Sequence, residues 1–376
     1  MILFMKKVFA LVKARRKVLY FILLKLLILC LLVPVSCSKN KENAGGGGGN
    51  FDIKAASNVA EAYMKSVEKG NMENAKKYYS KKLQEGSEDK ENKDFIITGF
   101  NITEATKVGD SGMFKIRVAR SSTKESYAAL DEYIVKVIKE GFDYKIDDTK
   151  NNPLKEAFLV YGKIRLKSKN NVDTSLLFDL DSVPNFAFSK DDKTNTDKLP
   201  VPKSKFDMMA FSYDGNKIIL TTSDTGFFVG YVKIDESKEV QGSDDSSGKK
   251  SNGDSSGQGT TAKEKPVGKE LMVLDVIKDS KIDFITFSQD EKYIAMEYNK
   301  ASTGKILRIY KSNNGDLIKY DFEKNFPAAK VNIDYSYFDK DTLYFEVSPK
   351  TQGDNSLKDY VGKWELDLKE LKAKKV

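Results

Sequence analysis

The sequence predicts an α+β cone-shaped domain followed by an all-β domain, a small or incomplete β-propeller, with an N-terminal signal or anchor helix in front of both. Three observations lead to this prediction. A basic and then apolar segment opens the chain, helical and then strand periodicity follows over residues 51–150, and a short motif recurs beyond them. With 376 residues, of which 40% are hydrophobic, the chain can form two packed domains.

The first 36 residues have the order of a secretory signal. A basic stretch at 6–17 precedes an apolar stretch at 18–35, and the small residue Ser36 stands directly before Cys37. This order resembles a bacterial lipoprotein precursor, in which the first mature residue is a cysteine that receives a lipid. The resemblance implies cleavage before Cys37 and lipidation of its thiol. The family prefers Leu three positions before the Cys, where this chain has Pro34.

Two other interpretations of the leader remain open. About 20 apolar residues span a bilayer, and residues 18–36 come close to that length, so the segment could be an uncleaved anchor. The product could also be secreted without an anchor, and translation could begin at Met5. The basic residues hold the N-terminus inside, so we expect the rest of the chain on the outer face of the cytoplasmic membrane. The many Lys residues and the lipoprotein features suggest a Gram-positive source.

The segment 37–50 follows as a tether. It contains five consecutive Gly residues, and such a run behaves as a flexible coil. No Gly-Lys-Ser or Gly-Lys-Thr comes after the run, so it does not form a phosphate-binding loop.

The distribution of charge argues against nucleic-acid binding. The formal net charge is +8, but seven basic residues and no acid lie within residues 1–36, which leaves +1 for the rest. A nearly neutral body exerts no long-range attraction on phosphates. Arg, the preferred ligand of phosphate and guanine, is also rare after the leader, where it occurs only as Arg117, Arg120, Arg165 and Arg308.

Residues 51–150 carry a helical pattern and then a strand pattern. Apolar residues recur at helical spacing from Ala56 to Val67, Gly70 ends this run, and Asn71 can cap a second, short helix. Alternating apolar and polar residues then predict four strands. We expect these strands at 94–106, 112–121, 127–139 and 142–148.

The run from Val59 to Tyr78 and the segment Val137–Asp148 resemble the helical opening and the closing hairpin of nuclear-transport-factor-like (cystatin-like cone) domains. The resemblance implies an α+β cone over residues 51–150. Enzymes of this family place a carboxylate or a His deep in the cone, and Asp131 and Glu132 are the acidic candidates. We expect both to lie at a solvated strand end, because acids are rarely buried without a partner.

A motif recurs in the second predicted domain, residues 151–376. It reads FSYDGNKIIL from Phe211, FSQDEKYIAM from Phe287 and, more loosely, YSYFDKDTLYF from Tyr335. The second and third copies begin 48 residues apart. The first and second begin 76 apart, or 45 apart without the 31-residue polar insert 236–266. These spacings fit one four-stranded propeller blade per copy, and the motif resembles the Phe-Ser-x-Asp-Gly turn of TolB-type and WD-type propellers.

We therefore expect three blades and part of a fourth. The predicted strands are 206–212, 217–223, 227–234 and 270–276 in blade one, 281–288, 292–298, 305–311 and 316–322 in blade two, and 331–337, 342–347 and 359–368 in blade three. Strands at 158–168 and 173–180 would supply a partial blade or close the ring. The insert 236–266 is too polar to order itself, so we expect a disordered loop. A twisted β-sandwich is the alternative fold.

The composition offers little catalytic chemistry. The chain has no His and only two Cys, which excludes His-based triads and His-containing metal sites. We therefore predict no enzyme activity, no catalytic residue, no metal and no cofactor. The leading hypothesis is a non-catalytic interaction or scaffold protein, tethered to the membrane and bound to an envelope protein or glycan. The alternatives are a small-ligand receptor that uses the cone cavity or the propeller axis, and a hydrolase that works through carboxylates.

Overall fold

The computed structural model describes residues 51–86, 94–192, 194, 196–235, 237, 264–300, 303–351 and 353–376. The predicted leader 1–36, Cys37, the tether and most of the insert lie outside the described residues. Residues 50–376 form one compact unit, which is mostly β. None of the helices in the described ranges is long and apolar enough to cross a membrane.

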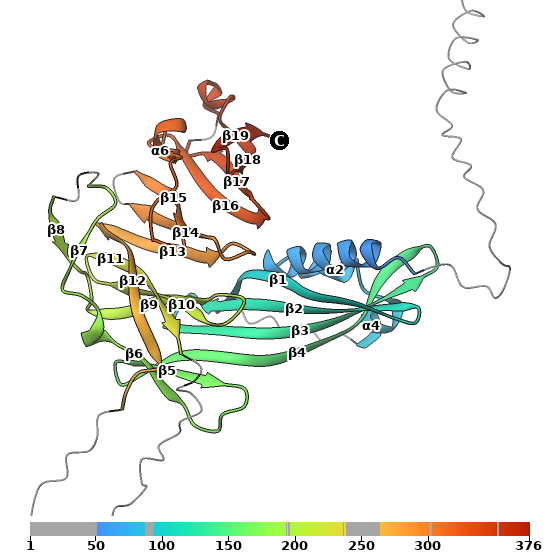
Figure 1. The fold of residues 1–376 in the computed structure, drawn as a ribbon. Coiled ribbons are helices and arrows are strands. Elements are labelled where there is room, and N and C mark those ends of the chain that lie inside the picture. The colour runs from blue at the N-terminus through green and yellow to red at the C-terminus, as the bar shows by residue number, and fades with distance from the viewer. Residues whose placement is uncertain are drawn as a thin grey trace, which may run out of the picture. The chain divides into compact units, whose positions relative to one another are not determined.

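Six antiparallel strands in sequence order form a curved sheet, called here the long sheet (Figure 1). Its strands are β1 (Phe95–Val108), β2 (Ser111–Ser122), β3 (Tyr127–Glu140), β4 (Asp143–Val160), β5 (Lys163–Ser168) and β6 (Ser175–Asp179). Their alternating apolar residues predicted the first three strands correctly. One face of the sheet packs against helix α2 (Ile53–Glu68), and together they bury an apolar core.

The structure confirms two predictions about the helices, namely Gly70 at the end of the first and Asn71 as the cap of the second. Asp52 caps α2 by accepting the N–H of Lys54 (2.8 Å), and Gly70 follows the helix with a φ of 65°. This left-handed conformation favours Gly. Asn71 then caps α3 (Met72–Lys76) by accepting the N–H of Asn74 (2.9 Å). A third short helix, α4 (Lys81–Gly86), follows.

The predicted domain boundary between residues 150 and 151 falls inside β4. This strand continues to Val160, and β5 and β6 extend the same sheet. The segments 158–168 and 173–180 were predicted to form part of a blade, but their strands belong to the long sheet instead. The alternating pattern alone did not show which sheet they join, because a strand on either sheet has the same period.

Three further antiparallel sheets correspond to the three copies of the motif. The first repeat sheet contains β9 (Lys205–Phe211), β10 (Lys217–Ser223), β11 (Gly226–Ile234) and β12 (Gly268–Lys278). The second contains β13 (Ser280–Phe287), β14 (Tyr293–Lys300) and β15 (Gly304–Lys311). The third contains β16 (Val331–Asp339), β17 (Thr342–Pro349), β18 (Gly362–Asp367) and β19 (Lys372–Lys375). A small pair, β7 (Phe186–Phe188) and β8 (Lys198–Pro200), forms a separate two-stranded sheet.

The prediction for the second repeat sheet was wrong in one strand. Segment 316–322 was expected to be its fourth strand, but it makes a single bridge between Leu317 and Tyr310 and then leads into the short helix α6 (Phe322–Asn325). Conversely, β19 completes the third repeat sheet without having been predicted. Its sequence, Lys372–Lys375, is too polar to show an apolar alternation.

Neighbouring sheets share apolar cores. The long sheet contributes Ala128 and Leu130 to a core with the first repeat sheet. The first and second repeat sheets share another core, which contains Phe227 and Tyr298. The second and third share one that contains Leu307 and Phe345. Successive sheets therefore pack face to face through these cores, as the blades of a propeller do.

Candidate functional site

The two close copies of the motif fold into the same turn. Ser212 Oγ donates to Asp214 Oδ1 (2.6 Å) and accepts the N–H of the first residue of β10 (3.1 Å). In the second copy, Ser288 Oγ donates to Asp290 Oδ1 (2.8 Å) and accepts the N–H of the first residue of β14 (3.0 Å). The Ser and the Asp, which lie two residues apart in both copies, therefore serve to close a turn between two strands.

Glu291 joins the two turns. It has a φ of 58°, at the position that Gly215 (φ 75°) occupies in the first copy. A non-glycine residue rarely adopts this conformation. The Glu291 carboxylate accepts the N–H of Asp214 (2.8 Å) and pairs with the ammonium of Lys217 (3.0 Å). The acid of the second turn thus binds the first turn.

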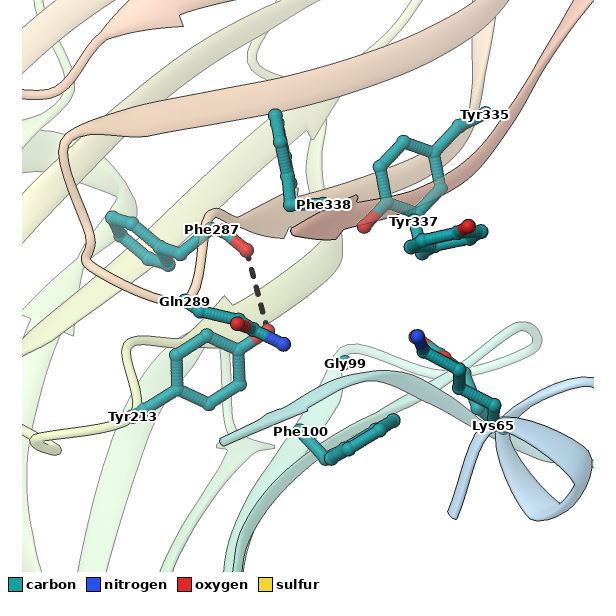
Figure 2. A pocket seen from close by; sticks show the side chains of 10 residues that line it. Lys65, Gly99, Phe100, Tyr213, Phe287, Gln289, Tyr335, Tyr337 and Phe338 are labelled. Atoms are coloured by element: carbon teal, nitrogen blue, oxygen red, sulfur yellow. Dashed lines mark hydrogen bonds between the residues drawn. The ribbon is translucent and has the colours of Figure 1, made fainter. Parts of the chain in front are cut away.

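Residues of all three motif copies line one small cavity (Figure 2). Tyr213 and Gln289 follow the motif serines of the first two copies, and Tyr337 belongs to the third. Lys65 of α2 lies across from them, with its ammonium 4.5 Å from the ring centre of Tyr337. The remaining lining residues are Glu68, Gly99, Phe100, Phe287, Tyr335 and Phe338.

Tyr213 makes the closest approach across this cavity. Its hydroxyl donates to the carbonyl oxygen of Phe287 (3.2 Å) and lies against Gly99, where an added Cβ would be 2.0 Å from the oxygen. The volume of the cavity is about 10 Å³, which is close to the minimum needed to hold one water molecule. The site is therefore a junction between α2, β1 and the motif turns, and it has no room for a ligand.

Two acids with raised pKa values flank Tyr335 at this junction. Burial raises the pKa of Glu68 to about 7, although Lys69 and Lys65 oppose the shift. Glu68 makes no hydrogen bond or ion pair with another described residue. Burial also raises the pKa of Glu297 to about 7. The hydrogen bond that its carboxylate accepts from the main-chain N–H of Tyr335 opposes this shift. The junction therefore contains two carboxyl groups that change charge near neutral pH.

A larger cleft, of about 390 Å³, lies beside β15. This volume is in the range of small-molecule sites. The cleft occurs where segment 316–322 leaves β15 instead of continuing as a fourth strand. Its apolar lining residues are Leu307, Ile309, Leu317, Tyr320 and Phe322.

A buried acid holds Arg308 at the cleft. Asp275 of β12 is fully buried, and its Oδ2 accepts hydrogen bonds from Arg308 Nη1 (2.8 Å) and the hydroxyl of Tyr310 (2.8 Å). Arg308 Nη2 pairs with Asp191. Burial alone would lower the pKa of Arg308, but Tyr310, Tyr298, Asp275 and Asp191 raise it, so the guanidinium stays charged. The guanidinium carbon Cζ of Arg308 lies 5.3 Å from the ring centre of Tyr298.

The charges that line the cleft are balanced. Three cations, Lys190, Arg308 and Lys324, are matched by three acids, Asp191, Asp321 and Glu323. Glu323 lies 3.8 Å from Arg308, whereas the Lys324 ammonium pairs with no other described residue. A ligand with one positive and one negative group would therefore find a partner for each.

The two acids singled out in the sequence do not lie in this cleft. Asp131 was expected at a solvated strand end, which is wrong, because it is fully buried within β3. Its Oδ2 accepts Arg120 Nε (2.6 Å), and its Oδ1 has no partner among the described residues. Glu132 lies 3.8 Å from Arg117 on the opposite face. The cross-strand Arg residues supply the pairing that the linear sequence does not show. Cys37 lies outside the described residues.

Sequence reasoning missed Arg308, because nothing near it in the sequence indicates a partner. Asp275 is 33 residues away and Asp191 is 117 residues away. The available signal was an Arg at the centre of an apolar strand, ILRIY, in a chain where Arg is rare. A charged residue at such a position needs a buried partner.

No family model matches the chain, and no curated protein matches it. Among solved structures, it aligns with a puromycin hydrolase at a TM-score of 0.28 and 8% identity, over 72% of this chain and 45% of the other. It aligns with a puromycin-hydrolyzing peptidase from Mycobacterium tuberculosis at a TM-score of 0.27 and 8% identity, over 73% and 45%. The β-propeller domain of Cps50 (Swd1) from Myceliophteria thermophila aligns at a TM-score of 0.23 and 9% identity, over 66% and 96%.

These comparisons correct the prediction of a non-catalytic, non-enzymatic protein, because the first aligned structures are hydrolases. The chain spans less than half the length of those hydrolases. The alignments assign neither a substrate nor a catalytic residue to it. Among the residues that the structure describes, no group of three or more acids, His or Cys is placed to hold a metal ion.

Proposed function

We propose that the protein binds a small zwitterionic molecule with an apolar side chain, such as an α-amino acid, in the cleft beside β15. The observation that carries this proposal is a cleft of about 390 Å³ whose lining combines matched cations and acids with an apolar wall. Lys324 and Arg308 would take the ligand carboxylate. Glu323 would take the ammonium, since its contact with Arg308 is long (3.8 Å). Leu317 and Tyr320, the two apolar lining residues that are only partly buried, would contact the side chain.

Calorimetry with leucine and N-acetyl-leucine amide tests this function on the purified full chain. Leucine should bind, and the uncharged amide should bind at least tenfold more weakly, because it offers no charged group to Lys324 and Glu323. Lys324→Gln should weaken leucine binding. Lys319→Gln is the matched control, since Lys319 is exposed and does not line the cleft. Equal affinities for the two compounds, or equal effects of the two variants, would contradict the proposal.

We also propose that Cys37 carries a lipid that holds the protein at the outer face of the cytoplasmic membrane. The order of basic, apolar and small residues before Cys37 supports this location. Intact-mass spectrometry of the chain purified from native membranes would detect the added acyl mass. It should be lost in Cys37→Ser. A native chain that retains residues 1–36 and lacks acyl groups would contradict lipidation.

We further propose that residues 51–150 derive from a nuclear-transport-factor-like cone and that the repeat sheets form an incomplete TolB-type propeller. Support for the first comes from the helices α2 and α3, which precede a curved antiparallel sheet. Support for the second comes from the matched Ser–Asp turns of the two close motif copies.

A further inference from the structure

Two hairpins of the long sheet end next to each other. The turn between β1 and β2 lies at 109–110, and the turn between β3 and β4 lies at 141–142. Because β2 pairs with β3 along its length, both turns lie at the same end of the sheet, called here the hairpin end. The opposite end meets the first repeat sheet, where Ser126 Oγ donates to the carbonyl oxygen of Phe206 (2.9 Å). Figure 1 shows the hairpin end on the far side of the sheet from the repeat sheets.

The described part of the chain also begins at the hairpin end. Phe51, the first described residue, packs against Tyr144 of β4, with the two ring centres 5.1 Å apart. The main-chain N–H of Asp52 donates to the hydroxyl of Tyr144 (2.7 Å). Tyr144 follows the β3–β4 turn by two residues. Residues 1–50, which include the proposed lipid-bearing Cys37, therefore join the folded unit beside the hairpin turns.

Each of the two hairpin tips exposes an apolar side chain. Phe142, in the β3–β4 turn, is fully exposed, and Val108, at the end of β1, is 55% exposed. A single exposed apolar residue is ordinary on a protein surface. Here two of them lie on adjacent hairpins, at the end where the chain enters the folded unit. An apolar surface at this position is close to the proposed membrane attachment.

The charges at the hairpin end nearly cancel. The hairpin tips, 106–113 and 138–145, contain three cations and three acids, which are Lys107, Lys139, Lys145, Asp110, Glu140 and Asp143. The start of α2 and helix α4 add three cations and two acids, which are Lys54, Lys81, Lys82, Asp52 and Glu85. A surface with so little net charge gains little from anionic lipids. Contact with a bilayer at this end must therefore be apolar.

We infer that the two hairpin tips rest on the lipid bilayer, with the side chain of Phe142 buried at the level of the headgroups. This inference rests on the proposed location at the membrane. Phe is one of the side chains that bury at this boundary. The 14 residues 37–50 span at most about 50 Å, which keeps the hairpin end near the surface that holds Cys37. One Phe has too little apolar area to bind a bilayer alone, but attachment through Cys37 raises its effective concentration there.

Tryptophan fluorescence of the variant Phe142→Trp tests the inference on the full chain, purified from membranes and reconstituted into phosphatidylcholine vesicles. Brominated acyl chains quench an indole only where it lies in the bilayer. The fluorescence added by Phe142→Trp should fall by about half or more in brominated vesicles, because Trp favours the interface. Tyr161→Trp is the matched control, since Tyr161 is 99% exposed but lies at the opposite end of β4, and it should not be quenched. The unsubstituted chain supplies the background of Trp364 for both.

The hairpin contact and the membrane location fail in different ways. If the chain floats with the vesicles but Phe142→Trp is quenched no more than Tyr161→Trp, the hairpin contact is wrong and the location stands. If the chain does not float with the vesicles, both are wrong. Quenching of Phe142→Trp that appears only after phosphatidylglycerol is added would also overturn the apolar contact. Acrylamide gives an independent readout from the water side, since the vesicles should shield Phe142→Trp from it and leave Tyr161→Trp accessible.

Discussion

Single residues decide how this protein responds to pH. Glu68 and Glu297 both have pKa values raised by burial to about 7, from an ordinary value of 4.5. Lys65 and Lys69 face Glu68 from its own helix, and Tyr213 and Tyr335 face it from the repeat sheets. Glu297 faces Lys305, Asp334 and Asp283. A folded state that holds protons more tightly than the unfolded chain loses stability as those protons leave.

We expect the free energy of unfolding to fall as pH rises from about 4.5 to about 7 and to level off above that. The folded protein binds the Glu68 proton in this window while the unfolded chain has released it. Glu68→Gln should flatten this decrease and raise the melting temperature at pH 8 by a few degrees. Thermal unfolding between pH 4.5 and 8 measures both effects.

Glu125→Gln is the matched control, because Glu125 is exposed and lies on a turn of the long sheet. It should leave the pH dependence unchanged. If Glu68→Gln has the same pH profile as the unsubstituted chain, the junction does not hold the carboxyl group in its protonated form.

At the scale of elements, the motif turn explains why two distant segments share a sequence. Ser288 is fully buried, and its hydroxyl both donates to Asp290 and accepts the first N–H of β14. Ser212 does the same in the first repeat sheet. Such turns set the register of the strands that they join. The Ser and Asp of the motif therefore specify the turn. The residue between them, Tyr213 in the first copy and Gln289 in the second, reaches the junction.

Ser288→Ala should lower the free energy of unfolding by about 1–3 kcal/mol, because it leaves the main-chain N–H of Tyr293 without its acceptor and removes one of the hydrogen bonds to Asp290. Urea unfolding followed by circular dichroism measures this. Ser336→Ala is the control, since the hydroxyl of Ser336 is half-buried and bonds to no other described residue. An equal loss of unfolding free energy in both variants would show that the hydrogen bonds of Ser288 do not stabilise the turn.

On the scale of the whole molecule, the pair Asp275–Arg308 links two sheets. Asp275 lies on β12 of the first repeat sheet and Arg308 on β15 of the second, and both are buried. A buried ion pair adds little over an apolar contact, but the loss of one partner leaves an unpaired charge. The link therefore secures the position of the cleft as much as the stability of the fold.

Arg308→Met should destabilise the chain by about 3–5 kcal/mol, because Asp275 then stays buried without its cation. The double variant Arg308→Met, Asp275→Asn should recover part of this loss. Urea unfolding of the two single variants and the double variant completes a double-mutant cycle. Strictly additive losses would mean that the two side chains do not interact.

The local sequence determined the elements. Helix α2, its Gly70 end, the strands of the first repeat sheet and the motif turns all follow from neighbouring residues, through periodicity, caps and turn chemistry. The prediction of a strand at 316–322 was wrong, because apolar residues of this segment pack on α6 and the third repeat sheet instead of pairing along β15. Strand β19 was not predicted, because its polar residues show no apolar alternation.

Only the tertiary structure decided which elements share a sheet and where charges meet. Strand β4 crosses the predicted domain boundary because its second half pairs with β5, a partner that periodicity cannot specify. Arg308 contacts Asp275 and Asp191 only because segments that are far apart in the chain pack together. No local sequence pattern therefore predicts the cleft. Periodicity is a property of neighbouring residues, whereas pairing and burial arise between segments that only folding brings together.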